Sequence, residues 1–145
     1  MAVRKATARW EGTLKEGVGT LKGKAIELGY SFTSRFEEGA GTNPEELIGA
    51  AHAGCYTMAL NVALERAGFL PKHVESTANV YIEKGDAGFS ITRIHLQVEA
   101  DVPNIDEAAF QQHVEATKTG CIVSRALAAV EITVDAKLLT GASPA

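Results

Sequence analysis

Alternating apolar and polar residues dominate the first third of the chain and predict short β-strands. Residues 6–10 alternate in this way, and a second segment at 18–25 follows a turn bounded by glycines. Residues 30–36 are also predicted to be extended, as far as the glycine-rich break at 39–41. We therefore expect the chain to begin with a β meander.

A long helix is predicted next. Asn43 can cap it, Pro44 suits the first helical position, and Glu46 stands three residues after the cap. The helix is expected to run from Pro44 to about Ala67 and to end at Gly68. Its apolar residues occur around almost the whole circumference, which is typical of a helix that is buried on nearly all sides. Because one small domain cannot cover such a helix, we expect an intertwined homodimer.

The rest of the chain continues the same mixture of strands and helices. The predicted elements are strands around 78–82 and 94–100, joined by a turn at 84–88 with a bulge near residues 92–93, helices at about 106–118 and 121–129, and a strand at 131–138. Strands and helices are segregated rather than regularly alternating, so the predicted fold class is α+β with antiparallel-rich sheets. No linker or repeat divides the pattern, and we expect a single domain over residues 1–145.

Composition excludes several classes of partner. Lys and Arg number 14 against 18 Asp and Glu, a formal net charge of −4, so the chain has no basic footprint for nucleic acid. The most apolar stretch, residues 47–64, contains His52 and Asn61 and predicts a buried helix rather than a membrane span. Residues 1–12 lack the apolar segment of an export signal. We therefore expect a cytoplasmic protein without a membrane partner.

The two cysteines are the candidate reactive groups. Cys55 lies within the apolar helix, where burial raises a thiol's pKa unless a cation is near, and Arg35 is the candidate cation. Cys121 follows Gly120 at a predicted helix start, where unpaired N–H groups favour the thiolate. The pair could be a peroxidatic and a resolving thiol. Two inert core thiols would give the same pattern.

His52 precedes Cys55 by about one helical turn and allows another interpretation. A Cys–His hydrolase would use the imidazole as the general base for the thiol. A structural histidine is the interpretation that we favour. His73, His95 and His113 are scattered without metal-ligand spacing. Some aromatic and apolar side chains could line a pocket for an alkyl peroxide, although core packing would use them as well: Trp10, Phe32, Phe36, Tyr56, Met58 and Phe89.

Several ordered runs of residues resemble the osmotically inducible protein C (OsmC) family. The runs are Ala8–Gly12, Arg35–Glu37, Gly41–Cys55, Asp86–Phe89 and Gly120–Ser124. The resemblance implies an OsmC-like fold with antiparallel-rich sheets packed around a long central helix in an intertwined homodimer. It also implies a thiol peroxidase that reduces organic hydroperoxides and hydrogen peroxide in oxidative and osmotic stress defence. Ile122 departs from the family, because many members have proline there.

The resemblance assigns roles to four residues. Cys55 would be peroxidatic, Cys121 would resolve it through a Cys55–Cys121 disulfide, and Arg35 with Glu45 would form the polar pair that activates Cys55. The partners would be an organic hydroperoxide, an external dithiol and a second copy of the chain, with no metal, haem or flavin. The alternative to an enzyme is a redox-sensing or small-molecule-binding dimer that uses the same thiols.

The spacing of Glu45 and Cys55 adds a geometric expectation. Ten residues of α-helix rise about 15 Å, so a carboxylate cannot reach a thiol ten residues along its own helix. If the pair serves Cys55, we expect it to act in trans, across a two-fold axis that runs the two long helices antiparallel.

Overall fold

The computed structural model describes residues 1–140, and contacts divide the chain into two compact units, Met1–Leu47 and Ile48–Ala145. The elements in chain order are β1 (Ala6–Glu11), β2 (Val18–Gly23), β3 (Glu27–Tyr30), α1 (Phe32–Phe36), α2 (Pro44–Arg66), β4 (His73–Gly85), β5 (Gly88–Asp101), α3 (Glu107–Gly120), α4 (Ile122–Ala126) and β6 (Glu131–Thr140). The boundary between the units falls inside α2. The expectation of one domain stays a prediction.

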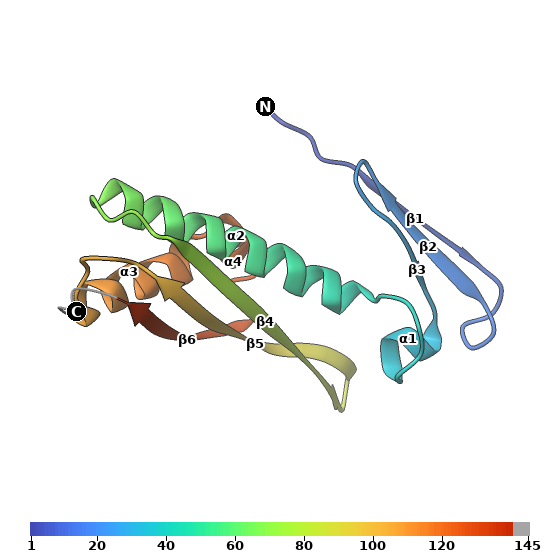
Figure 1. The fold of residues 1–145 in the computed structure, drawn as a ribbon. Coiled ribbons are helices and arrows are strands. Elements are labelled where there is room, and N and C mark those ends of the chain that lie inside the picture. The colour runs from blue at the N-terminus through green and yellow to red at the C-terminus, as the bar shows by residue number, and fades with distance from the viewer. Residues whose placement is uncertain (141–145) are drawn as a thin grey trace. The chain divides into compact units, whose positions relative to one another are not determined.

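The first unit is built on the expected meander, an antiparallel sheet in the order β1-β2-β3 (Figure 1). Gly19 of β2 is paired with Trp10 on one side and Tyr30 on the other. The two aromatic rings lie 5.4 Å apart between centroids, and a Cβ at Gly19 would collide with both of them. Glycine at this position therefore lets the rings meet over the central strand.

The prediction that residues 30–36 are extended is wrong beyond Tyr30, because helix α1 occupies Phe32–Phe36. Ser31 caps the helix: its hydroxyl accepts the Ser34 N–H at 3.1 Å, and its own N–H donates to the Ser34 hydroxyl at 2.8 Å. This capping box provides partners for backbone groups that an extended segment would have paired in a sheet. The sequence predicted an extended segment as far as the glycine-rich break, but local capping decides the conformation.

The long helix begins and ends close to the predicted residues. The Glu46 N–H donates to Asn43 Oδ1 at 2.8 Å, so Asn43 caps α2 as expected. The helix ends at Arg66, and Gly68 follows with a φ of 93°, the left-handed conformation that glycine adopts readily.

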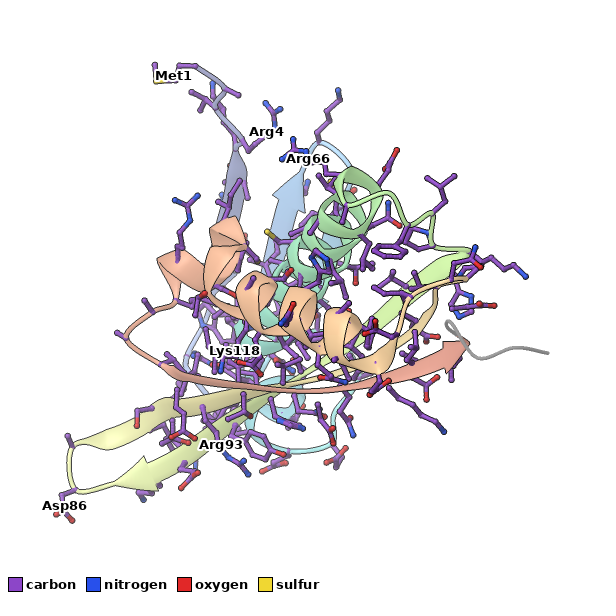
Figure 2. All side chains as sticks on the ribbon, turned by 90° about the vertical axis from the view of Figure 1, so that its left-hand side faces the viewer. Met1, Arg4, Arg66, Asp86, Arg93 and Lys118 are labelled. Carbon is purple, nitrogen blue, oxygen red and sulfur yellow. The ribbon has the colours of Figure 1, made fainter. Side chains whose placement is uncertain are left out.

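The second unit contains a mixed sheet in the order β4-β5-β6. β4 and β5 form the expected antiparallel hairpin, and Figure 2 shows Asp86 at its tip. The predicted bulge is confirmed: Tyr81 pairs with Arg93 and Ile82 with Ile91, which leaves Thr92 as the extra residue. β6 runs parallel to β5 after a return through α3 and α4. The pattern of residues along β6 predicted the strand but not its direction.

The two later helices differ slightly from the predicted ranges. Asp106 caps α3 rather than belonging to it, and its carboxylate accepts the Ala109 N–H at 2.7 Å. α4 spans only Ile122–Ala126, shorter than the predicted 121–129. Cys121 is the N-cap residue of α4, and Leu127 is its C-cap residue.

One face of α2 packs in the core of the second unit. Tyr56, Leu60 and Leu64, spaced four residues apart, are completely buried. They belong to a cluster with residues of β5, α3 and the intervening loop: Leu96, Val98, Ala100, Val102, Ile105, Phe110 and Val114. The helix is long and apolar enough to cross a bilayer by length and composition, a test that a core helix also passes.

The opposite face of α2 is exposed in the single chain. Ala51 and Gly54 are exposed, and Met58 retains 71% of its surface. A Cβ at Gly54 would meet no other atom within 4 Å. The chain alone therefore covers one side of a helix whose other side is also apolar.

Replacing Leu60 by alanine should destabilise the protein by about 2–5 kcal/mol, because it removes a completely buried side chain and leaves a cavity. Urea denaturation at fixed protein concentration measures this loss. The matched control is Leu70→Ala, at a side chain that is 70% exposed, which should change stability by less than about 1 kcal/mol. Equal losses in the two variants would contradict the assigned core.

Candidate active site

Helix α2 and the α3–α4 junction bring the two cysteines together. The sulfurs of Cys55 and Cys121 lie 3.0 Å apart, although the residues are 66 positions apart in sequence. A disulfide bond is about 2.05 Å long, so a small approach of the sulfurs would allow one to form. Cys121 is buried and Cys55 is partly buried.

Cys121 is held at the junction by both of its neighbouring helices. Its backbone N–H donates to the Thr117 carbonyl at 3.1 Å at the end of α3. Its sulfur accepts the Ser124 N–H at 3.4 Å at the start of α4. The direction of the Cys121 side chain is therefore fixed by backbone contacts on either side.

The surroundings of the two sulfurs differ, and their pKa values shift in opposite directions. Burial raises the pKa of Cys55, and the hydrogen bond with Cys121 raises it further. Burial also favours the neutral form of Cys121, but hydrogen bonds from Cys55 and from the backbone and hydroxyl of Ser124 outweigh it and lower the pKa. Of the two thiols, Cys121 is therefore the one whose thiolate form the single chain favours.

No positive charge contributes to either thiol's pKa shift among the residues described. The candidate cation, Arg35, belongs to the first unit, on α1. Its Nη2 lies 2.7 Å and its Nε 3.1 Å from Glu45 Oε1, in the first turn of α2. The Glu45 side chain is only 8% exposed, so the guanidinium pairs an otherwise buried charge. The predicted Arg35–Glu45 pair is therefore present.

A cavity of about 400 Å³ lies beside Arg35 in the first unit. Its lining is largely aromatic and apolar and comprises Trp10, Gly12, Leu14, Tyr30, Ser31, Phe32, Arg35 and Phe36. Three of the six side chains expected from the sequence to line an apolar pocket are present here. Of the others, Tyr56 is completely buried in the core, and Met58 and Phe89 are 71% and 58% exposed.

His52 is completely buried and does not contact Cys55 in the manner of a catalytic dyad. Its Nε2 lies 2.8 Å from the hydroxyl of Ser124. Burial lowers the pKa of His52, so the imidazole is neutral at pH 7. Sequence reasoning did not assign Ser124 a role. Its position three residues after Cys121 was a signal that could have found it.

Neither unit contains the complete set of four residues on its own. Arg35 and Glu45 lie in the first unit, and the two thiols lie in the second. Between residues 1 and 140, no group of three or more His, Cys, Asp or Glu side chains could hold a metal ion.

Known proteins resemble this chain over most of its length. A family model described as OsmC-like protein matches residues 37–136. Peroxiredoxin OsmC of Escherichia coli is 49% identical over 138 residues, which cover 93% of this chain and 96% of that protein. An organic hydroperoxide resistance protein of Xanthomonas axonopodis is 33% identical over 116 residues, which cover 77% and 79%.

Solved structures show the same fold at lower sequence identity. The organic hydroperoxide resistance protein OhrB of Bacillus subtilis matches with a TM-score of 0.74 and 22% identity, covering 94% of this chain and all of that one. An OsmC-like protein of unknown function from Vibrio cholerae matches with a TM-score of 0.76 and 14% identity, covering 94% and 100%. The α+β fold, the family model and the extensive identity together show that this chain belongs to the OsmC-like protein family.

Proposed function

We propose that this protein is a cysteine-based peroxidase that reduces organic hydroperoxides and hydrogen peroxide. The names of its relatives, a peroxiredoxin and an organic hydroperoxide resistance protein, support a peroxidase role. The observation that carries the mechanism is the 3.0 Å contact between the Cys55 and Cys121 sulfurs. We place the protein in the cytoplasm, where thiol reductants keep both cysteines reduced.

The reaction requires two thiols and a reductant. The Cys55 thiolate attacks the terminal oxygen of the peroxide, the O–O bond breaks, and the alcohol leaves after taking a proton. Cys55 becomes a sulfenic acid, and the Cys121 thiolate attacks its sulfur. The S–O bond breaks, hydroxide leaves and is protonated to water, and a Cys55–Cys121 disulfide forms. An external dithiol is oxidised in returning both cysteines to thiols.

Arg35 and Glu45 would make Cys55 reactive by acting in trans. Within one chain the pKa of Cys55 is raised, so the first step requires a cation that favours its thiolate. Glu45 lies ten residues before Cys55 in the same continuous helix, a rise of about 15 Å. In a homodimer with antiparallel α2 helices, the first turn of one helix would lie beside the middle of the other. The exposed Ala51–Gly54–Met58 face supports such pairing.

The aromatic cavity beside Arg35 suits the organic part of the substrate. Its volume of about 400 Å³ falls within the range of small-molecule sites, and its aromatic lining favours alkyl and aryl groups over water. With the guanidinium at its edge, a hydroperoxide could place its organic group in the cavity and its oxygens near the cation. Organic hydroperoxides would then be preferred to hydrogen peroxide.

Substitution of each cysteine should separate the two steps. Cys55→Ser should abolish reduction of cumene hydroperoxide, since the attacking sulfur is lost. Cys121→Ser should reduce one equivalent and leave Cys55 as a sulfenic acid. Peroxide consumption with excess dithiol, together with dimedone labelling and mass spectrometry, measures both outcomes. Equal loss of the first turnover in both variants would overturn the assigned roles. A wild-type protein that reacts once but never turns over would instead be a redox sensor.

Replacing Arg35 by alanine should move the pH–rate curve of Cys55 oxidation to higher pH by about 1–3 units, because the cation that favours the thiolate is gone. Stopped-flow rates between pH 5 and 10, at sub-stoichiometric peroxide, give the midpoint. Arg35→Lys is the matched control, because it keeps the charge but loses the bidentate contact. Its pH midpoint should lie between those of the wild type and of Arg35→Ala. An unchanged curve in Arg35→Ala would remove Arg35 from the site.

A mixed dimer tests whether Glu45 acts in trans. One chain carries Glu45→Ala and the other Cys55→Ser, so trans action leaves one intact site and one site with both defects. We expect about half of the wild-type activity per dimer. The control pairs Glu45→Ala with a Glu45→Ala, Cys55→Ser double variant, which restores no complete site. Activity of the assembled heterodimer no higher than this control would mean that Glu45 serves its own chain.

A further inference from the structure

The buried pair formed by His52 and Ser124 is not used by the mechanism above. His52 is completely buried on α2, and Ser124 is 3% exposed on α4. His52 precedes Cys55 by three residues, and Ser124 follows Cys121 by three residues. The pair therefore joins the two elements that carry the reacting sulfurs, about one helical turn from each sulfur.

The hydrogen-bonding partners of His52 determine which ring nitrogen carries the proton. Its Nε2 is 2.8 Å from the Ser124 hydroxyl, whereas the buried Nδ1 has no hydrogen-bond partner among the described residues. The neutral ring holds a single N–H. A buried N–H without an acceptor is costly, so the proton belongs on Nε2, which donates to Ser124 Oγ.

This tautomer leaves the hydroxyl hydrogen of Ser124 free to donate elsewhere. Hydrogen bonding by the Ser124 side chain is among the causes that lower the pKa of Cys121. The Ser124 backbone N–H donates to the same sulfur at 3.4 Å. With the opposite tautomer the hydroxyl hydrogen would point at His52 Nε2, and the sulfur would lose one of its two donors from Ser124.

We propose that His52 and Ser124 are positioning residues for the resolving step: His52 orients the Ser124 hydroxyl, which donates to the Cys121 sulfur and keeps it aimed at Cys55. This role rests on the proposed peroxidase function. Neither residue gives up its proton. The Cys121 sulfur supplies the electron pair that forms the S–S bond, and the S–O bond of the Cys55 sulfenic acid breaks with departure of hydroxide.

The same contacts favour the reductive half of the cycle. When the external dithiol attacks the Cys55 sulfur, the S–S bond breaks and its electron pair goes to Cys121. A leaving thiol of low pKa departs faster, and the Ser124 donors stabilise the charge that develops on it. The dithiol is oxidised as the protein disulfide is reduced.

The pH dependence of the resolving step reports mainly on Cys121. Among the described residues, the titratable groups that interact with Cys121 are Cys55 and Tyr56, both from α2. His52, also from α2, reaches it through Ser124. Burial raises the pKa of Tyr56 far above neutrality, and its hydroxyl donates to the Val114 carbonyl at 2.9 Å. Cys55 is a sulfenic acid when resolution occurs. The His52 ring, whose pKa burial lowers, is neutral above pH 7. A pH midpoint of disulfide formation between neutrality and the ordinary pKa of a thiol would therefore belong to Cys121.

Rapid-quench kinetics of the full-length protein test this role. Reduced protein is mixed with one equivalent of cumene hydroperoxide, and Cys55 sulfenic acid and disulfide are followed separately by dimedone trapping and mass spectrometry. In Ser124→Ala and His52→Leu we expect disulfide formation at pH 7 to slow about tenfold and its pH midpoint to rise by about one unit. The sulfenic acid should accumulate. Ser90→Ala, at an exposed serine of β5, is the matched control and should behave as wild type.

A conservative variant distinguishes orientation of the hydroxyl from simple packing. His52→Gln keeps an N–H donor for Ser124 without a titrating ring, so its pH midpoint should stay near that of wild type. If the His52–Ser124 contact only stabilised the packing, Ser124→Ala and His52→Leu would lower the melting temperature or the active fraction. The pH midpoint of disulfide formation would then stay unmoved. Unmoved midpoints in Ser124→Ala and His52→Leu, or equal shifts in His52→Gln and His52→Leu, would overturn the proposal.

A second measurement separates failure of this inference from failure of the peroxidase proposal. In a Cys55→Ser background, the ultraviolet absorbance of the thiolate gives the pKa of Cys121 without any peroxide. Adding Ser124→Ala should raise that pKa by about one unit. An unchanged pKa would overturn the inference even if the wild type reduces peroxides. A raised pKa in a protein that reduces no peroxide would instead leave the Ser124 contact in place and contradict the peroxidase function.

Discussion

The apolar surface of helix α2 is the constraint on which the rest of the structure depends. Tyr56, Leu60 and Leu64 are completely buried against the sheet and α3, and this packing fixes the rotation of the helix about its axis. Cys55 is adjacent to Tyr56, so the rotation that buries the tyrosine also directs the thiol toward the α3–α4 junction. Hydrophobic burial thereby positions the candidate reacting group.

Cys121 has a structural role, and the proposed mechanism gives it a chemical one as well. It closes α3 through its backbone N–H and caps α4 through its sulfur, so its position is determined by two helix ends. The contact between its sulfur and the Ser124 N–H is also one of the hydrogen bonds that favour its thiolate. A residue held in this way needs little rearrangement to reach Cys55, which suits a resolving thiol that must intercept a short-lived sulfenic acid.

The Arg35–Glu45 ion pair and the two thiols lie in different units of the chain. Arg35 is neutralised by Glu45 in the first unit, while the thiols of the second unit have no cation contributing to their pKa among the described residues. The exposed apolar face of α2 and the raised pKa of Cys55 are independent observations, and the second copy in the proposed homodimer bears on both. It would cover the helix and supply the guanidinium.

The sequence by itself determined most of the local structure and the identity of the candidate groups. Asn43 and Gly68 marked the ends of α2, alternation marked β4 and β5 with the bulge at Thr92, and the family resemblance singled out Cys55, Cys121, Arg35 and Glu45. The helix ends and the strands depend on neighbours within a few residues. The four candidate residues were found because runs of this sequence can be compared directly with those of a known family. Local chemistry also explains the wrong prediction at residues 32–36, where the capping box of Ser31 and Ser34 forms a helix in place of the expected extended segment.

Only the tertiary structure decided which distant groups meet. Three contacts join residues 38 to 72 positions apart: the parallel pairing of β6 with β5, the 3.0 Å contact between the sulfurs, and the hydrogen bond between His52 and Ser124. Such contacts are determined by the burial of apolar faces that are distant in the sequence. The periodicity of one segment shows which face is apolar but not which segment packs against it. The pKa values follow the same rule: a helix-start position suggested a thiolate at Cys121, but the donors from Ser124 and Cys55 that outweigh its burial exist only in the folded chain.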